Sequence, residues 1–133
     1  MSFTARVDPT CRVNYLRMSG VVTFADLSAA QRALADDDAF DPTFGVLVDL
    51  RAAEEVRLTW QEMQILVVAS AVAPTSRRAI LVGSPGVLGM ARLYQSMREH
   101  ETAVDVVRAC QTMDEAIAWL GIDALELQER DGA

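Results

Sequence analysis

The side chains of this chain that could do chemistry are few, and their spacing matches no catalytic motif. Ser84 lies in a Gly83-Ser84-Pro85 turn instead of the Gly-x-Ser-x-Gly turn that exposes a serine nucleophile. His100, the one histidine, comes at the far end of the same predicted helix, about 24 Å away at about 1.5 Å of rise per residue. A serine–histidine pair is therefore not expected. The N–H groups of residues 83–86 could receive an anion, but without the spacing of a phosphate-binding loop a turn with a helix cap explains them.

Asp49 is the carboxylate in the most suggestive place. It lies at the carboxyl end of an apolar run, residues 46–50, where open α/β sheets form their ligand crevices. An enzyme built on this chain would have to use Asp49 with a partner such as Arg92 or Tyr94. The candidate ligand- or partner-binding residues are Asp49, Arg51, Thr59, Ser84, Arg92 and Tyr94.

The remaining charged clusters favour no site. Two arginines at 77–78 could clamp an anion, but only one can face inward on a strand, and they lie at the strand's N-terminal end, away from the expected crevice. The acids at 54–55 are typical of an exposed loop. Three adjacent acids at 36–38 have no further ligands at a recognisable spacing. No catalytic residue, metal site or cofactor is predicted.

Composition limits the class of protein. The chain has 133 residues, a net charge of −7 and 51% apolar residues, which predicts a single domain over 1–133 with a core at about 10–121 and a C-terminal extension at 122–133. All 12 basic residues are arginine, and they form no basic stripe, so nucleic acid is not an expected partner. No apolar run reaches the roughly 18 residues of a membrane span, and the start of the chain lacks the features of a signal peptide. A cytoplasmic protein with Cys11 and Cys110 as reduced thiols is expected.

Helix starts are the clearest local signals. A threonine is followed three residues later by an acid at Thr23, Thr59 and Thr112, each time before an apolar helical pattern. The hydroxyl can accept from a backbone N–H of the first turn, and the acid can reach back to the N–H of the cap. Ser84-Pro85 gives a fourth start, with proline at the first helical position.

These starts alternate with β-rich runs, so the chain is predicted to be α/β. The expected strands are residues 3–8, 11–18, 46–50, 77–82 and 103–109, with a break at 19–20. The expected helices are Phe24–Ala35, a helix after Thr59, a helix from Pro85 to about Arg98, and Met113–Leu120 with Gly121 as its C-cap. Residues 51–58 are predicted as a loop and 99–102 as a polar connector. The central strands should be parallel, with one of the first two strands as an antiparallel edge.

The helix after Thr59 is apolar all round at residues 65–69, although a helix on the outside of a small sheet needs a wet face. We therefore expect the extra apolar surface of this helix to be covered by another subunit or by the C-terminal tail. The candidate interface residues are Ile65, Leu66, Val67 and Val68.

Four stretches in this order resemble a known family: residues 46–51 (VLVDLR), 78–80 (RAI), 89–94 (GMARLY) and 114–120 (DEAIAWL). The chain is similar to STAS domains, the SpoIIAA-like fold of anti-anti-sigma factors, and most similar to an uncharacterised bacterial branch called STAS/Sec14-like. The resemblance implies a two-layer fold with a mixed sheet of about five strands and four helices. Partner-switching STAS proteins carry a phosphorylatable serine just after the central strand. Residues 49–55 have neither serine nor threonine there, and the nearest hydroxyl, on Thr59, is explained as a cap.

Three functions follow as hypotheses. The first is a non-enzymatic protein-interaction and regulatory module, a homodimer or a hetero-complex that buries the helix after Thr59. The alternative is a binder of a small apolar ligand, such as a lipid, in a pocket lined by Met63, Leu66, Met90, Leu93 and Met97. The third is an enzyme using Asp49.

Overall fold

The structure is a computed structural model that describes residues 2–68, 73, 75–102 and 106–122, and it alternates strands with helices after an initial hairpin. The elements in chain order are β1 (Ser2–Asp8), β2 (Val13–Thr23), α1 (Phe24–Ala35), β3 (Gly45–Arg57), α2 (Trp60–Val68), β4 (Arg78–Val82), α3 (Pro85–Thr102), β5 (Val107–Cys110) and α4 (Met113–Leu120). The predicted order of elements is confirmed.

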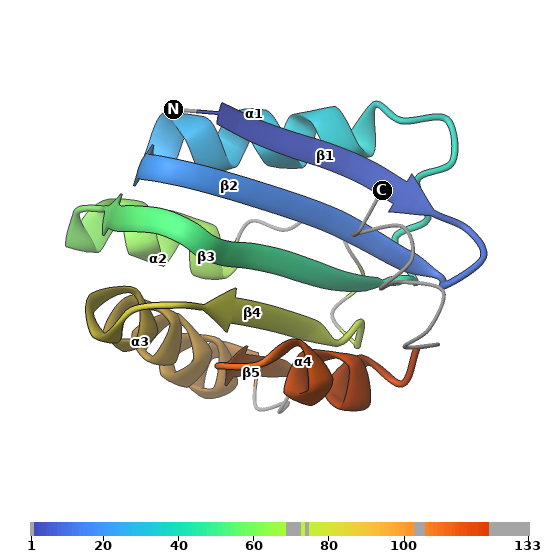
Figure 1. Ribbon diagram of the computed structural model, residues 1–133. Helices are drawn as coiled ribbons and strands as arrows, with labels where there is room; N and C mark the ends of the chain where they lie inside the picture. The colour runs from blue at the N-terminus through green and yellow to red at the C-terminus, as the bar shows by residue number, and fades with distance from the viewer. Residues whose placement is uncertain (1, 69–72, 74, 103–105, 123–133) are drawn as a thin grey trace.

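The five strands form one mixed sheet in the order β1-β2-β3-β4-β5. β1 pairs antiparallel with β2 at one edge, and the other three pairings are parallel. Both sheet predictions are therefore confirmed. Figure 1 shows α1, α2 and α3 behind the sheet and α4 in front of it.

Side-chain caps start the helices as the sequence predicted. Thr23 forms a complete capping box with Asp26. Thr59 does the same for α2, because its Oγ1 accepts from the Glu62 N–H at 3.1 Å and its own N–H donates to Glu62 at 2.9 Å. Thr112 accepts from the third residue of α4, which ends in left-handed Gly121 with φ 67°.

Two strands are longer than the sequence predicted. β2 continues across the expected break because Gly20 adopts φ 72° within an irregular stretch of the β2–β3 register, and pairing resumes to Thr23. β3 continues to Arg57, so the predicted loop at 51–58 is wrong. Its polar second half pairs with residues 19–23 of β2, and this neighbour satisfies backbone groups that the charged sequence suggested would face solvent.

The prediction for 99–102 is also wrong, because α3 continues to Thr102. Gln95 donates to Glu99 one turn later at 3.3 Å, a contact typical of a continuing helix. The last strand is shorter than predicted and begins at Val107; residues 103–105 and the predicted extension beyond 122 lie outside the described residues.

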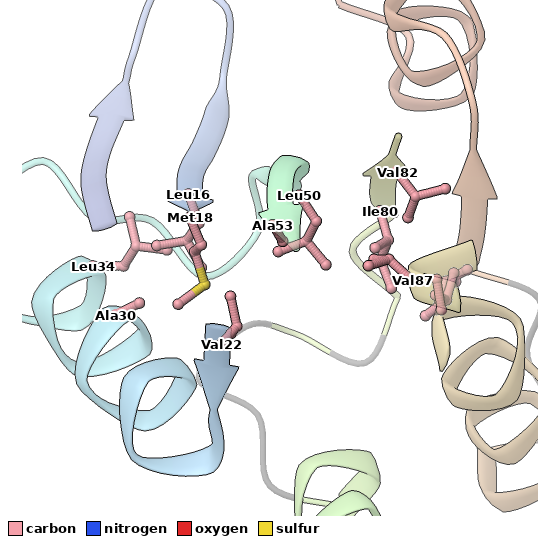
Figure 2. Close-up of a cluster of buried hydrophobic side chains, with 13 residues drawn as sticks. Leu16, Met18, Val22, Ala30, Leu34, Leu50, Ala53, Ile80, Val82 and Val87 are labelled. Atoms are coloured by element: carbon pink, nitrogen blue, oxygen red, sulfur yellow. The ribbon is translucent and has the colours of Figure 1, made fainter. Parts of the chain in front are cut away.

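Two clusters of buried side chains lie on opposite faces of the sheet, as strand alternation requires. Figure 2 shows the larger cluster, where β2, β3 and β4 meet α1 and α3; its members include Leu16, Met18, Leu34, Leu50, Ile80 and Val87. We call this side the three-helix face. The second cluster is packed by α4 and contains Val13, Tyr15, Leu47, Leu81, Cys110 and Ile117. We call this side the α4 face.

Both cysteines belong to the α4 face and are buried and free, as predicted. Burial, with Glu115 nearby, raises the pKa of the Cys110 thiol to about 11, while Arg108 opposes the rise. A thiol with this pKa stays protonated at neutral pH and is a poor nucleophile.

Two glycines near α3 differ in how closely the chain approaches them. Gly89 on the helix is exposed, and a Cβ there would meet no atom within 4 Å. Gly83 is the tight position, where a Cβ would lie 2.9 Å from the Arg51 carbonyl oxygen. The turn after β4 therefore needs glycine because it abuts β3.

Candidate functional site

A cavity of about 120 Å³ lies on the three-helix face, between the sheet and its helices. Its walls are almost entirely apolar and come from every layer of that side. The sheet contributes Leu16, Val46, Val48, Leu50 and Ile80, and the helices contribute Leu27, Leu34, Met63, Leu66, Val87, Met90 and Ala91. Among the described residues, the polar side chains in the lining are Gln31, Arg78 and Tyr94. The cavity therefore combines an apolar body with one cationic corner.

Arg78 supplies that corner from the first residue of β4. Its side chain is only 7% exposed, and its Nη1 donates to the Tyr94 hydroxyl oxygen at 2.7 Å. Burial lowers the pKa of the Arg78 guanidinium, the nearby Arg98 lowers it further, and Tyr94 opposes both effects. An arginine remains protonated in spite of such a shift, so the cavity has a buried positive charge in its wall.

Arg98 adds a second buried guanidinium on α3 close to this corner. It is buried, and its Nη1 donates to the carbonyl oxygen of Val67 in the last turn of α2. A cation at a helix C-terminus is attracted by the partial negative charge there. Arg98 therefore ties α2 to α3 beside the cavity.

The backbone of Arg78 is held from both sides. Its N–H donates to the Val106 carbonyl oxygen at 2.8 Å, and its carbonyl oxygen accepts from Trp119 Nε1 of α4 at 3.0 Å. Arg77 faces the opposite way, with its guanidinium 4.8 Å from the Trp119 ring centre. The expectation that only one arginine of this pair faces inward is confirmed, and α4 helps to set which one.

Asp49 lies on the α4 face at the centre of a network of arginines. It accepts from Arg51 Nη2 at 2.7 Å, from Arg51 Nε at 3.0 Å and from the Tyr15 hydroxyl at 3.2 Å, and Arg17 Nε is 3.5 Å away. The Arg51 backbone N–H also donates to it at 3.0 Å. The carboxylate is thus held by two arginines and a tyrosine.

Burial alone would raise the pKa of Asp49, but the hydrogen bonds from Arg51 and the charges of Arg51 and Arg17 outweigh it and leave the pKa below its ordinary value. A general acid or base needs a pKa near the working pH. With its pKa lowered, Asp49 is held as an anion in an ion-pair network.

The structure does not bring Asp49 together with Arg92 or Tyr94, the arrangement that an enzyme was predicted to need. Val48 and Leu50 line the cavity, so Asp49 between them points to the α4 face, whereas Tyr94 lines the cavity on the three-helix face. Arg92 is exposed on α3. The sheet separates Asp49 from both predicted partners, because strand alternation sends neighbouring residues to opposite sides.

The hydroxyl groups of Ser84 and Thr59, both predicted as binding candidates, accept hydrogen bonds at the starts of helices. Ser84 precedes α3, and its Oγ accepts from the Val87 N–H at 3.4 Å. Thr59 is an exposed helix cap, as shown above, and is the first hydroxyl after β3. Of the six predicted binding candidates, Asp49 and Arg51 are brought together, while Tyr94 joins Arg78 at the cavity.

The predicted interface helix is divided by the structure. Leu66 and Val67 are buried in the core, so they are corrected from surface candidates to packing residues. Ile65 and Val68 are 48% and 63% exposed, and Trp60, which the sequence reasoning missed, is 59% exposed. The missed signal was a tryptophan at the first position of a helix whose fourth, seventh and eighth residues face the core.

The predicted ligand pocket is also partly assembled. Met63, Leu66 and Met90 line the cavity. Leu93 is exposed, and Met97 is not among the lining residues. Arg78 was missed as a lining residue because it lies at the N-terminal end of its strand, away from the expected crevice. The available signal was that Arg77 and Arg78 are neighbours on a strand and must point to opposite faces.

Comparisons with known proteins agree with this architecture. No family model matches the sequence, and no curated protein matches it. Among solved structures, the chain is similar to an anti-sigma factor antagonist from Mycobacterium paratuberculosis, with 18% identity, a TM-score of 0.59, and 90% of this chain and 95% of that chain covered. It is also similar to an uncharacterized protein with a SpoIIAA-like fold from Shewanella loihica, with 15% identity, a TM-score of 0.52, and 89% and 93% covered.

The chain has a SpoIIAA-like fold. The resemblance expected from the four sequence stretches is confirmed at this level, and the described residues form a mixed sheet of five strands with four helices. Among the described residues, no helix is both long and apolar enough to cross a membrane.

Proposed function

We propose that this protein is a non-enzymatic, cytoplasmic regulatory module that works by binding protein through the outer face of α2. The observation that carries the proposal is the set of exposed apolar side chains on that helix: Trp60, Ile65 and Val68. Ile65 and Val68 are three positions apart and are neighbours on the surface of the helix, and Trp60 is exposed in its first turn. We call these three residues the α2 patch.

The composition of the α2 patch suits an interface. An aromatic anchor and two aliphatic side chains are the residue types that dominate interface energies when buried. Gln61 and Gln64 are exposed on the same helix and give the patch a polar, uncharged border. Support also comes from the fold, because the similar solved structure named an anti-sigma factor antagonist is, by that name, a regulator that opposes another protein.

We propose a second copy of the chain as the partner. With a net charge of −7, two copies repel each other unless they meet on neutral surfaces. The five exposed residues of α2 between Trp60 and Val68 carry no charge. A two-fold dimer uses the same patch on both subunits, and the α2 patch can face itself without like charges in contact. Since residues 49–55 contain no hydroxyl, we further propose that phosphorylation in that segment does not control the assembly.

Native mass spectrometry and sedimentation velocity test this proposal. The wild-type protein should give a dimer of twice 14.5 kDa, and Ile65→Asp with Val68→Asp should give a folded monomer. Ala33→Asp is the matched control, because Ala33 is exposed on α1 and its replacement should leave the dimer intact. Val67 is unsuitable for this test, since a charge at a buried position would unfold the chain. A wild-type monomer at micromolar concentration, or dimers in the double variant, would contradict the proposal.

A second candidate function is the binding of a small apolar ligand, and the cavity favours it. Its volume of about 120 Å³ is close to that of an engineered cavity of about 150 Å³ that binds benzene. It is well below the roughly 300 Å³ at which pockets for drug-sized ligands begin. We therefore propose a ligand of benzene-like size in place of the phospholipid or polyprenyl that a Sec14-like lipid binder would hold.

A further inference from the structure

We propose that the end of β3, residues 53–57, binds an extended segment of another protein in which basic and apolar side chains alternate. We call these residues the β3 overhang. The segment would add to the sheet as a strand in line with β4, with main-chain hydrogen bonds giving affinity and side chains giving specificity. The overhang shares no residue with the α2 patch, so this inference goes beyond the proposed dimer. It is carried by the juxtaposition of an open strand edge and exposed acidic side chains.

The β3 overhang exists because β4 ends before β3 does. The last pair between the two strands is Leu50 with Val82, whereas β3 continues to Arg57. The chain turns toward α3 at Gly83, where a Cβ would lie 2.9 Å from the Arg51 carbonyl oxygen. Figure 1 shows the arrow of β3 running past the end of β4. An extended segment placed beyond Gly83 would therefore continue the line of β4.

Backbone pairing holds one side of the β3 overhang and leaves the other side open. β2 pairs with it as far as Thr23 and Arg57, so its strand conformation is fixed before any partner binds. Successive residues of a strand direct their N–H and C=O groups to opposite sides, so every second residue of the overhang directs them away from β2. Among the described residues, no backbone hydrogen bond reaches 53–57 from the side of β4. These groups are a template for a further strand.

Charge favours a basic segment at this edge. Glu54, Glu55 and Arg57 are all exposed, and two acids with one base give the overhang a net charge of −1. Arg57 Nε donates to Glu55 at 2.7 Å. The paired end of β2, residues 19–23, has no charged side chain, and the whole chain carries −7. A second copy would bring charge of the same sign to the edge, whereas lysine or arginine side chains would meet opposite charge.

The two faces of the β3 overhang differ, and this difference predicts the alternation in the bound segment. Ala53 is buried and Val56 is partly buried, and both pack in the cluster of the three-helix face. The acidic side chains are exposed instead. Because successive side chains of a strand point to opposite faces, a bound segment would place every second residue beside the acids and the others toward Val56. Basic residues suit the first set, and apolar residues such as valine suit the second.

The test is a titration of the ¹⁵N-labelled full chain with the peptide acetyl-Lys-Val-Lys-Val-Lys-Val-amide, followed by two-dimensional ¹H–¹⁵N NMR. Amide signals of residues 53–57 should shift, and those of α4 should stay in place. Two further peptides have N-methyl groups on the three valine nitrogens or on the three lysine nitrogens. Only alternate N–H groups of a bound strand face β3, so one isomer should bind at least about tenfold more weakly than the other.

Charge is tested by Glu54→Gln with Glu55→Gln, which should weaken binding of the unmodified peptide by about fivefold. Asp38→Asn with Glu101→Gln is the matched control, because both residues are exposed and the net charge changes by the same amount. The control should leave the affinity unchanged. Equal losses in the two double variants would show that only the overall charge of the protein attracts the peptide, which would overturn a basic partner at this edge.

The remaining outcomes separate this inference from the proposed dimer. If the unmodified peptide shifts no signal of residues 53–57 at millimolar concentration, or if the two methylated isomers bind equally, pairing with the edge is overturned and the α2 patch is unaffected. The Ile65→Asp, Val68→Asp variant should bind the unmodified peptide as wild type does. Loss of binding in that variant would overturn the independence of the β3 overhang from the α2 patch.

Discussion

The two faces of the sheet each bury a charged side chain, and the two side chains have different surroundings. On the α4 face, Asp49 is 2% exposed and meets two arginines and a tyrosine, so its charge is met by opposite charge. On the three-helix face, Arg78 is 7% exposed, and its Nη1 donates to the neutral hydroxyl of Tyr94 beside an apolar cavity. Equal burial therefore does not imply equal function. Asp49 belongs to an ion-pair network, whereas Arg78 contacts a tyrosine hydroxyl and borders a cavity.

The two faces also differ in how completely their apolar side chains fill the space between the layers. Both faces contain side chains with no exposed surface, such as Val13 and Leu47 on the α4 face and Met18 and Val22 on the three-helix face. The three-helix face has more apolar residues but leaves a space of about 120 Å³ between them. The α4 face is the one expected to resist changes of volume, and the three-helix face is the one expected to absorb them.

The largest effect is expected from removing the charge of Asp49. Asp49→Asn should lower the free energy of unfolding by about 2 kcal/mol at pH 7, because Arg51 and Arg17 lose their anion in a mostly buried site. The pKa of Asp49 is lowered in the folded state, so its contribution is complete above the unfolded pKa of about 4 and is lost as the pH falls through the folded pKa. Urea unfolding at pH 7 and pH 3 should show the gap between wild type and variant shrinking at the lower pH.

Glu55→Gln is the control for that experiment. Glu55 pairs with Arg57 at 2.7 Å, but both side chains are at least half exposed, so the change should be close to zero at either pH. A gap for Asp49→Asn that stays constant down to pH 3 would show that charge is not what this face requires.

The next effect compares the same substitution on the two faces. Val13→Ile should destabilise the protein by about 1–2 kcal/mol, because the added methylene enters a fully packed region. Val48→Ile should stabilise it by up to about 0.8 kcal/mol, because the methylene enters the cavity. Thermal unfolding of both variants measures the difference, and equal losses would show that the two faces are packed alike.

A smaller effect is expected from the tryptophan that joins the faces. Trp119→Phe removes an N–H that donates to the Arg78 carbonyl oxygen at 3.0 Å and lies 3.3 Å from that of Val106. The free energy of unfolding should fall by about 1 kcal/mol, because the Arg78 carbonyl oxygen loses a donor. Urea unfolding measures this loss, and an unchanged free energy of unfolding would rule out a specific role for the Trp119 N–H.

The smallest effect should be a gain at the outer surface of α3. Gly89→Ala should stabilise the protein by about 0.5–1 kcal/mol, because the position is exposed and helical and a Cβ meets nothing within 4 Å. Gly83→Ala should instead destabilise it, since its Cβ would lie 2.9 Å from a backbone oxygen of β3. Differential scanning calorimetry distinguishes the two, and a lower melting temperature for Gly89→Ala would contradict this assignment of the tight position.

The candidate site was only partly predictable from sequence. Met63, Leu66, Met90 and Tyr94 were singled out and do lie in the cavity wall, because helical spacing identifies residues that face inward. Arg78 was not, since its importance comes from Tyr94, sixteen positions along the chain and on another element. Asp49 was found by its place on a strand, but the arginines that surround it were needed to show that it is an ion-pair partner.

What the sequence by itself determined are the features controlled by near neighbours along the chain. Thr23, Thr59 and Thr112 start their helices, and Gly121 ends the last one, because a cap is a contact between residues a few positions apart. Tertiary structure alone decided the length of β3, the orientation of Arg78 and the division of α2 into buried and exposed residues. Each of these depends on a partner from a distant part of the chain, and only the folded arrangement of β2, α3 and α4 supplies it.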